Sequence, residues 1–323
     1  MRNLGHHRGR LTRRRLPRPQ RDVFIGEDDI STGRRASNKT RMKTISLINM
    51  KGGVGKTTLA VNIGYALAKL RGKRVLLVDA DPQFNATQYL VQDTTYLAHL
   101  DAGKRTVYNI LVGTPPTVTT VSRRKRSHPP HPPTLANTVI SIYAGTSGKL
   151  DLVPSQLELL EAQNIERGGE RRLATFLETA TNEYDYAIID CPPTISVFTL
   201  SAFLASDGYL VPVKPDPLST IGLPLLERAM SEYTRLFQRT VTQVGIVPTM
   251  MRANTNLMTR TLAAMRRRWG AKVFAHSLSH SVYVAAAVEA RQPLFEYPDT
   301  RIRWGQELSD ITDEFETACG TLP

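Results

Sequence analysis

The sequence predicts an α/β fold in which a doubly wound, mostly parallel sheet carries helices on both faces. From Lys43 onward, apolar runs alternate with amphipathic helical patterns, which is the order that builds parallel sheets. The runs at residues 75–78 and 186–190 are almost entirely apolar, as expected for strands buried on both faces. A glycine-rich segment at residues 51–58 follows the apolar run 45–49 and opens a helical pattern. These three observations define the fold class.

Strand and helix patterns follow one another along the whole of this region. The first helix carries apolar residues three and four positions apart, at Leu59, Ile63 and Leu67, and Gly72 ends it. The later helices are predicted from the same spacing, and the strands from short apolar runs between turn residues. We expect strands at residues 45–49, 75–78, 150–154, 186–190, 208–213, 243–247 and 272–274, and helices at residues 58–70, 86–100, 157–165, 171–181, 202–205, 223–236, 256–269, 282–290 and 306–318.

Two basic segments stand apart from this alternation. Residues 1–42 are polar and arginine-rich, so we expect a disordered basic arm before a single domain at residues 43–323. Residues 113–138 are proline-rich and carry four consecutive cations, which predicts a flexible basic insertion. The net charge of the chain is +13, and residues 1–43 hold 13 Lys and Arg against four acids. A nearly neutral body with two basic segments predicts a polyanionic partner.

The composition argues against several other classes of protein. Two cysteines, Cys191 and Cys319, cannot build a disulfide framework or a multi-cysteine metal site, and a reducing cytosol fits them. No apolar run reaches the length of about 18 residues that a membrane-spanning helix needs. The arginine-rich beginning lacks the apolar centre of a secretory signal.

The glycine-rich segment has the chemistry of a phosphate-binding loop. Glycines let successive backbone N–H groups turn toward an anion, and the helix N-terminus adds a partial positive charge. Lys56 is expected to reach the β- and γ-phosphates, and the Thr57 hydroxyl is expected to bind Mg²⁺. Met50 stands at the first glycine position of the general pattern, and an extra lysine, Lys51, follows it. The expected phosphate-binding residues are Lys51, Gly52, Gly53, Val54, Gly55, Lys56, Thr57 and Thr58.

Acidic residues follow two of the predicted core strands. Asp79 and Asp81 are two residues apart, so near the end of a strand they project to the same side. Asp190 ends the apolar run 186–190, and a hard carboxylate oxygen at a strand tip suits Mg²⁺. Carboxylates at this edge of a parallel sheet lie beside the bound ligand, so we expect all three near the phosphates.

The sequence Lys51-Gly-Gly-Val-Gly-Lys-Thr-Thr58 resembles the deviant Walker A motif of the ParA/MinD family of ATPases, with the ParA and Soj type as the nearest members. The segment that begins at Asp79 resembles the family's switch motif. The segment that ends at Asp190 resembles its Walker B motif. The resemblance implies ATP and Mg²⁺ as cofactors and an ATP-sandwich homodimer in which Lys51 acts across the interface. It further implies that Asp81 polarises the attacking water, that Asp79 supports the Mg²⁺ shell and that Asp190 binds Mg²⁺.

The resemblance extends to residues 245–257 and has identifiable departures. Residues 245–257 are similar to a family segment near the adenine, which makes Thr249 and Met250 the expected base contacts. Asn254 and Tyr283 stand where family members carry arginines implicated in DNA binding, which questions that particular surface. Phe84 stands where the switch motif has glycine, which predicts a different backbone there.

The first functional hypothesis is a DNA-partition ATPase for a plasmid or a chromosome. The resemblance implies an ATP dimer that binds DNA without sequence preference and hydrolyses ATP slowly until a ParB-type adaptor stimulates it. The implied location is the cytoplasm, in association with the nucleoid and without a membrane partner. Basic side chains hold DNA through its phosphates. The candidates are Arg13, Arg14, Arg15, Arg123, Arg124, Lys125, Arg126, Arg266, Arg267 and Arg268.

Three other readings stay open. A MinD-like ATPase would act on a membrane or protein cargo, but residues 307–316 are acidic where a membrane-binding helix is basic. An iron-protein reductase needs cysteine ligands in a pattern that Cys191 and Cys319 do not supply. An interaction protein that no longer hydrolyses ATP would keep the fold without the chemistry. The sequence also leaves open a translation start downstream of residue 42.

Overall fold

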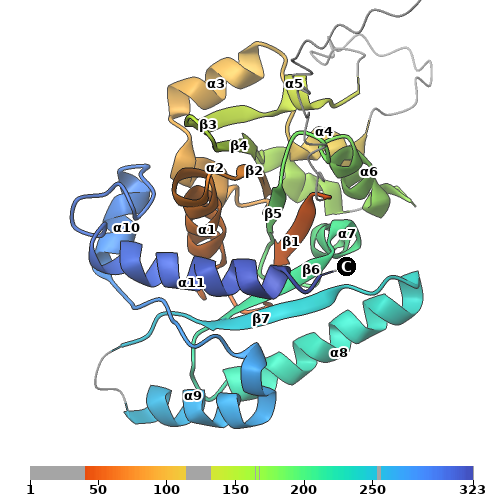
Figure 1. Cartoon of the computed structure of the whole chain (residues 1–323). Helices are drawn as coiled ribbons and strands as arrows, with labels where there is room; N and C mark the ends of the chain where they lie inside the picture. Colours follow the sequence, from red (N-terminus) through yellow and green to blue (C-terminus); the bar gives the residue numbers. More distant parts are fainter. Residues whose placement is uncertain (1–40, 114–131, 164, 167, 253–255, 323) are drawn as a thin grey trace, which may run out of the picture. The chain divides into compact units, whose positions relative to one another are not determined.

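The computed structural model describes residues 41–113, 132–163, 165–166, 168–252 and 256–322. Its sheet has seven strands in the order β3-β4-β2-β5-β1-β6-β7 (Figure 1). Only β3 and β4 pair antiparallel, and the other neighbours in this sheet are parallel. The strands are β1 (Lys43–Leu47), β2 (Arg74–Asp79), β3 (Ile140–Ala144), β4 (Lys149–Val153), β5 (Tyr186–Asp190), β6 (Gly208–Val213) and β7 (Thr242–Pro248).

Helices connect these strands. The α-helices are α1 (Lys56–Arg71), α2 (Asn85–Leu90), α3 (Asp93–Asp101), α4 (Val107–Val112), α5 (Leu135–Thr138), α6 (Arg172–Glu178), α7 (Val197–Ala205), α8 (Ser219–Phe237), α9 (Asn256–Trp269), α10 (Val282–Glu289) and α11 (Arg303–Cys319). Short 3₁₀ helices are η1 (Leu157–Gln163), η2 (Gly169–Arg171) and η3 (Gly270–Lys272). None of the described helices is long and apolar enough to span a bilayer.

The sheet separates two apolar cores. Leu76 and Val78 of β2 belong to one core, together with residues of α4, α6, α7, α8 and α9. Val75 and Leu77 belong to the other, together with residues of α1, α2, α10 and α11. Figure 1 shows α1 and α11 together on one side of the strands. Because successive strand residues face opposite ways, continuous apolar runs are needed to fill both layers. The expected doubly wound sheet is confirmed.

Parallel pairing brings the carboxyl ends of β1, β2 and β5 to one edge of the sheet. In register, Leu47 lies beside Asp190 on one side and Asp79 lies beside Asp190 on the other. The loop that follows β1 therefore begins next to Asp190, and Asp79 lies one strand further along the same edge. This edge is where ligands bind in open α/β sheets.

The prediction of one continuous helix at residues 86–100 is wrong, because this region forms two helices, α2 and α3. Val91 ends α2 in an extended conformation with φ −114° and ψ 129°, and α3 begins at Asp93. The Arg291 guanidinium donates hydrogen bonds to the Val91 carbonyl at 2.7 Å and to the Asp93 carboxylate at 2.6 Å. A side chain about two hundred positions away thus satisfies the groups that the break exposes, which local periodicity cannot reveal.

Other elements were missed or are shorter than predicted. The edge strand β3 and the helix α4 have no counterpart among the predicted elements. The strand predicted at residues 272–274 is a single bridge between Val273 and Ile246. The arm at residues 1–42 lies outside the described residues except for its last two. The insertion at 113–138 also lies largely outside them, and α5 occupies residues 135–138.

Candidate nucleotide site

The loop between β1 and α1 has the backbone that anion binding requires. Gly53 and Gly55 have φ values of 69° and 82°, a left-handed region that strains other residues. Gly55 is the N-cap of α1, so the N-terminal end of that helix faces the loop. A Cβ added at Gly52 or Gly53 would meet no heavy atom within 4 Å. The outer side of the loop is therefore open to a ligand.

A pocket of about 330 Å³ lies against this loop. The predicted residues from Gly52 to Thr58 line it, together with Asp81 and Met250. Gln83, Asn85, Gln88, Tyr89, Pro193 and Val288 also line it, and sequence reasoning did not assign them. Gln83 and Asn85 could have been inferred, since they directly follow Asp81 in the switch segment. Val288 could not, because α10 reaches the pocket only through tertiary packing.

Lys56 is the cation of this pocket. Its side chain is held near Asp190 and Asp81, and only 7% of the residue is exposed. Burial lowers the pKa of Lys56, while the neighbouring Asp190, Cys191 and Asp81 oppose that change. A buried ammonium with its charge held toward the loop is suited to neutralise phosphate oxygens.

Asp190 and Thr57 form the candidate Mg²⁺ site. The Thr57 hydroxyl donates to Asp190 Oδ2 at 2.6 Å, while the buried Oδ1 of Asp190 has no hydrogen-bond partner among the described residues. Burial and, to a smaller extent, the charge of Asp81 raise the pKa of Asp190 to about 7, although Thr57 and Lys56 act to lower it. An unsatisfied buried carboxylate oxygen is costly, and Mg²⁺ would satisfy it.

The rest of the described site supports Mg²⁺ over a metal held by many side chains. No group of three or more His, Cys, Asp or Glu that could hold a metal ion occurs in the described part of the chain. Mg²⁺ commonly takes only one or two protein oxygens and completes its shell with water and phosphate oxygens. Thr57 and Asp190 therefore fit Mg²⁺ bound together with a nucleotide.

Asp79 is placed beside this site but is already engaged within the protein. Its Oδ2 accepts hydrogen bonds from the Thr87 amide at 2.8 Å and the Thr87 hydroxyl at 2.7 Å. Its Oδ1 accepts from the Asp81 amide at 3.3 Å. Burial and the adjacent Asp190 raise the pKa of Asp79 well above its usual value. Asp79 thus anchors α2 and the switch segment, and support of the Mg²⁺ shell stays a prediction.

Asp81 lies where the phosphate pocket meets a second cavity. Its Oδ1 accepts the Gln83 amide at 2.9 Å, and burial raises the pKa of its carboxyl. The second cavity, of about 400 Å³, is lined by Asp81 with Leu160 and the segment from Pro192 to Phe198. Asp81 thus lines both cavities, and its role in orienting the attacking water stays a prediction.

Phe84 keeps the backbone that a glycine would adopt. Its φ is 42° and its ψ is 40°, in the left-handed region. The ring stacks on Tyr96 with centroids 6.2 Å apart and planes 15° from parallel. Whether this backbone differs from that of relatives with glycine at this position stays a prediction. Aromatic packing offsets the strain that a side chain costs there, about 1–2 kcal/mol.

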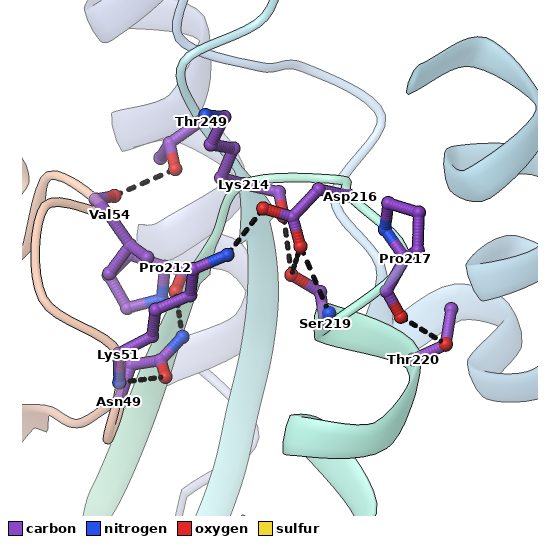
Figure 2. A network of polar contacts seen from close by, with 10 residues as sticks. All are labelled: Asn49, Lys51, Val54, Pro212, Lys214, Asp216, Pro217, Ser219, Thr220 and Thr249. Atoms are coloured by element: carbon purple, nitrogen blue, oxygen red, sulfur yellow. Dashed lines mark hydrogen bonds and ion pairs between the residues drawn. The ribbon is translucent and has the colours of Figure 1, made fainter. Parts of the chain in front are cut away.

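Lys51 does not line the phosphate pocket of its own chain. Its Nζ forms an ion pair with Asp216, which precedes α8 (Figure 2). Thr249 is also engaged, since its buried hydroxyl donates to the Val54 carbonyl at 2.7 Å. Met250 lines the pocket, and its Cε would lie 3.5 Å from a Cβ at Gly55. Base contacts by Thr249 and Met250 stay predictions.

The predicted basic residues differ in their surroundings. Arg266 donates to the Ala275 carbonyl at 3.0 Å, and the Arg268 guanidinium lies 4.7 Å from the centre of the Trp269 ring. Arg267 is exposed and pairs with no described residue. Tyr283 packs near Trp304 with ring centroids 6.2 Å apart. Asn254 and the candidates Arg13, Arg14, Arg15, Arg123, Arg124, Lys125 and Arg126 lie outside the described residues.

Comparisons with known proteins agree with this geometry. A sequence model of the AAA domain matches residues 42–243. The chain is 32% identical over 277 residues to the sporulation initiation inhibitor protein Soj of Bacillus subtilis, covering 84% of this chain and 97% of Soj. It is 31% identical over 256 residues to the chromosome partitioning protein ParA of Caulobacter vibrioides, covering 79% of this chain and 87% of ParA.

Solved structures share the fold. Cobyrinic acid a,c-diamide synthase from Mycobacterium smegmatis, with a bound ATP analogue and magnesium, has a TM-score of 0.60 and 26% identity, covering 77% of this chain and 93% of its own. A plasmid partition protein from Borrelia burgdorferi has a TM-score of 0.61 and 21% identity, covering 86% of this chain and 99% of its own.

The fold, the phosphate loop and the paired carboxylates define a P-loop ATPase that uses ATP and Mg²⁺. Within that class, the chain belongs to the AAA domain family and is of the ParA/MinD type, close to the ParA and Soj proteins.

Proposed function

We propose that this ATPase partitions DNA, as a homodimer that encloses ATP between two copies and binds DNA without sequence preference. The ParA and Soj relatives support the class of cargo. A ParB-type adaptor would accelerate an otherwise slow hydrolysis and so release the DNA. The expected location is the cytoplasm, on the nucleoid.

Each step of hydrolysis has a residue of this chain suited to it. Lys56 and the amides from Gly52 to Thr57 would hold the phosphates, and Thr57 with Asp190 would hold Mg²⁺. When bound, Mg²⁺ would supply charge neutralisation at the phosphates. Asp81 would orient the attacking water. Phosphoryl transfer to water depends mainly on such positioning and on charge stabilisation.

The observation that carries the dimer proposal is the direction of Lys51. A lysine within the phosphate loop would be expected to add to the charge of its own pocket, but this one points to Asp216 (Figure 2). Its side chain is 36% exposed, so it can reach a second molecule. Lys51 is therefore available to the phosphates of a second copy, and hydrolysis would depend on assembly.

The helix α9 offers the described part of a DNA-binding surface. Arg260 and Arg267 lie seven residues apart, close to two helical turns, and both are exposed. Neither pairs with a described residue, in contrast to Arg266 and Arg268. An exposed guanidinium group with no partner in the protein gives up no intramolecular contact when it binds a phosphate. We therefore place Arg260 and Arg267 first among the described DNA contacts.

The test is DNA binding by the full chain with ATP, with ADP and without nucleotide, across a series of salt concentrations. Binding of any sequence that requires ATP supports the proposal. Replacing Arg260 and Arg267 by alanine should reduce the slope of log K against log salt by about 0.9 for each lost phosphate contact. Arg235→Ala, which removes an exposed arginine paired with Glu232, is the control and should leave the slope unchanged.

Two results would contradict this function. Equal binding with and without nucleotide would make the basic segments a passive anchor. No binding at moderate salt would favour the MinD-like alternative, in which the cargo is a membrane or a protein.

A further inference from the structure

The ion pair between Lys51 and Asp216 joins the phosphate loop to the beginning of α8. Lys51 Nζ donates to Asp216 Oδ2, and the two side chains are 36% and 21% exposed. Figure 2 shows the lysine reaching from the loop across the end of β6 toward the aspartate. The two residues are 165 positions apart in the sequence, so only the placement of β6 beside β1 makes the pair.

Asp216 is held in place independently of Lys51. Its Oδ1 accepts the Ser219 amide at 3.1 Å and the Ser219 hydroxyl at 3.0 Å. The same hydroxyl also lies 2.5 Å from the Lys214 carbonyl, so these two acceptors share its single proton. One oxygen of Asp216 thus anchors the first turn of α8, and the other is available to a cation. These hydrogen bonds do not involve Lys51, so they can hold Asp216 in place when the lysine moves.

The backbone of Lys51 is also fixed. Its amide donates to Asn49 Oδ1 at 3.0 Å, and Asn49 Nδ2 donates to the Pro212 carbonyl at 2.6 Å (Figure 2). Both ends of the ion pair are therefore anchored, and only the flexible side chain of Lys51 is free to turn. Release of this lysine is a side-chain rotation and needs no rearrangement of the loop.

The pair lies where a second molecule can reach it. The residues that follow Asp216 at the start of α8 include Leu218 and Ile221, which are 67% and 62% exposed. Exposed apolar side chains on one end of a helix are readily covered by association. A second copy that approaches this end of α8 would meet the Lys51 side chain together with its partner.

We propose that Asp216 is a positioning residue that retains Lys51 within its own subunit until the phosphates of a second, ATP-bound copy displace it. This inference rests on the proposed function, because it assigns the regulation of the lysine that acts across the dimer. A single carboxylate competes weakly with the clustered charges of a nucleoside triphosphate bound with its metal. The retained lysine therefore adds a threshold to dimer formation, and the triphosphate overcomes it.

Asp216→Asn separates the two roles of the aspartate. The asparagine Oδ1 still accepts the Ser219 hydrogen bonds, so α8 keeps its anchor, while the charge that retains Lys51 is lost. Asp313→Asn is the matched control, since Asp313 on α11 is an exposed carboxylate that pairs with Arg71 at the end of α1. Lys51→Ala, alone and combined with Asp216→Asn, completes a double-mutant cycle.

The first measurement concerns the free protein. Competitive acetylation of lysine amines in the nucleotide-free chain, read by peptide mass spectrometry, reports how available each amine is. Asp216→Asn should increase the labelling rate of Lys51 about threefold, as expected for loss of a partly exposed ion pair, with Lys104 as the internal reference. An unchanged Lys51 rate would overturn the inference without touching the proposed function.

The second measurement is the dimer Kd by sedimentation velocity with Mg²⁺ and a non-hydrolysable ATP analogue. Asp216→Asn should lower the Kd about threefold for each ion pair, or about tenfold for a symmetric dimer with two of them. In the Lys51→Ala background, where dimerisation is expected to be lost, Asp216→Asn should not restore it. A dimer restored in that background would show that Asp216 acts through general repulsion. A weaker Asp216→Asn dimer would show that Asp216 is needed in the dimer itself.

The wild-type chain separates the two proposals. If it dimerises with the ATP analogue and Lys51→Ala does not, the proposed function stands whatever Asp216→Asn does. If the wild-type chain stays monomeric, the proposed function fails and the inference about Asp216 fails with it.

Discussion

Two lysines of one loop, Lys56 and Lys51, lie in opposite environments. Lys56 is 7% exposed and faces Asp190 and Asp81 inside the phosphate pocket. The side chain of Lys51 is 36% exposed and is held outside that pocket by Asp216. Burial lowers the pKa of Lys56, so its surroundings disfavour the charged form of the lysine. The pKa of Asp216 is lowered because its hydrogen bonds to Lys51 and Ser219 outweigh burial, so its surroundings favour the charged carboxylate.

The difference shows how one motif separates binding from control. The inner lysine lies buried beside Asp190, the candidate Mg²⁺ ligand, so we expect its role to be tied to the nucleotide bound in the same chain. The outer lysine is held by one surface carboxylate, and another anion can take the place of that carboxylate. The carboxylates beside the two lysines also differ in their pKa values. Burial raises the pKa of Asp190 to about 7, while the pKa of Asp216 is lowered.

The largest expected effect comes from exchanging each lysine for alanine. Lys56→Ala should weaken nucleotide binding by at least about 100-fold, because a buried, charge-assisted contact to phosphate is lost. Lys51→Ala should change it by less than about threefold, since a partly exposed pair contributes little. Titration with a fluorescent ATP analogue measures both, with the exposed Lys104→Ala as control. Equal losses for the two variants would contradict the separation of roles.

The next effect sharpens the contrast between the two carboxylates. The pKa of Asp190 is raised from 3.8 to about 7 in the folded protein. The folded state therefore loses stability as pH rises from about 4 to about 7, and the loss is constant above that. Asp190→Asn should stabilise the nucleotide-free protein by about 1–4 kcal/mol at pH 8 and by less at pH 5, and it should abolish the Mg²⁺ dependence of ATP binding.

Thermal unfolding at the two pH values, with and without Mg²⁺ and nucleotide, measures this prediction. Asp101→Asn, at an exposed carboxylate, is the control and should show no such trend. A destabilised Asp190→Asn protein at pH 8 would mean that the fold compensates the Asp190 charge.

A smaller effect concerns the part of the loop between the two lysines. Thr249→Val removes the hydroxyl that holds the Val54 carbonyl and leaves a buried acceptor unpaired. We expect a loss of about 1–3 kcal/mol in the free energy of unfolding and weaker nucleotide binding, because the loop backbone is less fixed. Denaturant titration gives the first value, and Thr249→Ser, which keeps the hydroxyl, should remain near wild type. If Val is as stable as Ser, this hydrogen bond does not secure the loop.

The smallest effect is at Phe84, beside the inner lysine's pocket. Glycine fits the left-handed backbone but loses the stacking on Tyr96, so Phe84→Gly should change stability by less than about 1 kcal/mol. Phe84→Ala loses the stacking and keeps the strain, so it should be less stable than Phe84→Gly by about 1 kcal/mol. Chemical denaturation of the two variants compares them directly. The reverse order would mean that the backbone relaxes when the ring is removed.

Local patterns predicted the elements whose boundaries depend on nearby residues. The helix expected at 256–269 is α9 without change, and the phosphate loop lies between β1 and α1 as the glycine and lysine spacing required. The strand β3 was missed, because Ile140–Ala144 buries little of its surface and is defined by antiparallel pairing with β4. The break at Val91 was missed because Arg291 supplies the partner for its carbonyl.

The sequence by itself determined the class of fold, the loop that binds phosphate and the carboxylates that accompany it. These follow from short segments and from the rule that parallel strands end at one edge of the sheet. Only the tertiary structure decided that the Thr249 hydroxyl holds the Val54 carbonyl and that Lys51 pairs with Asp216. Those contacts join groups more than 160 positions apart, and no local spacing specifies which of the available groups will meet.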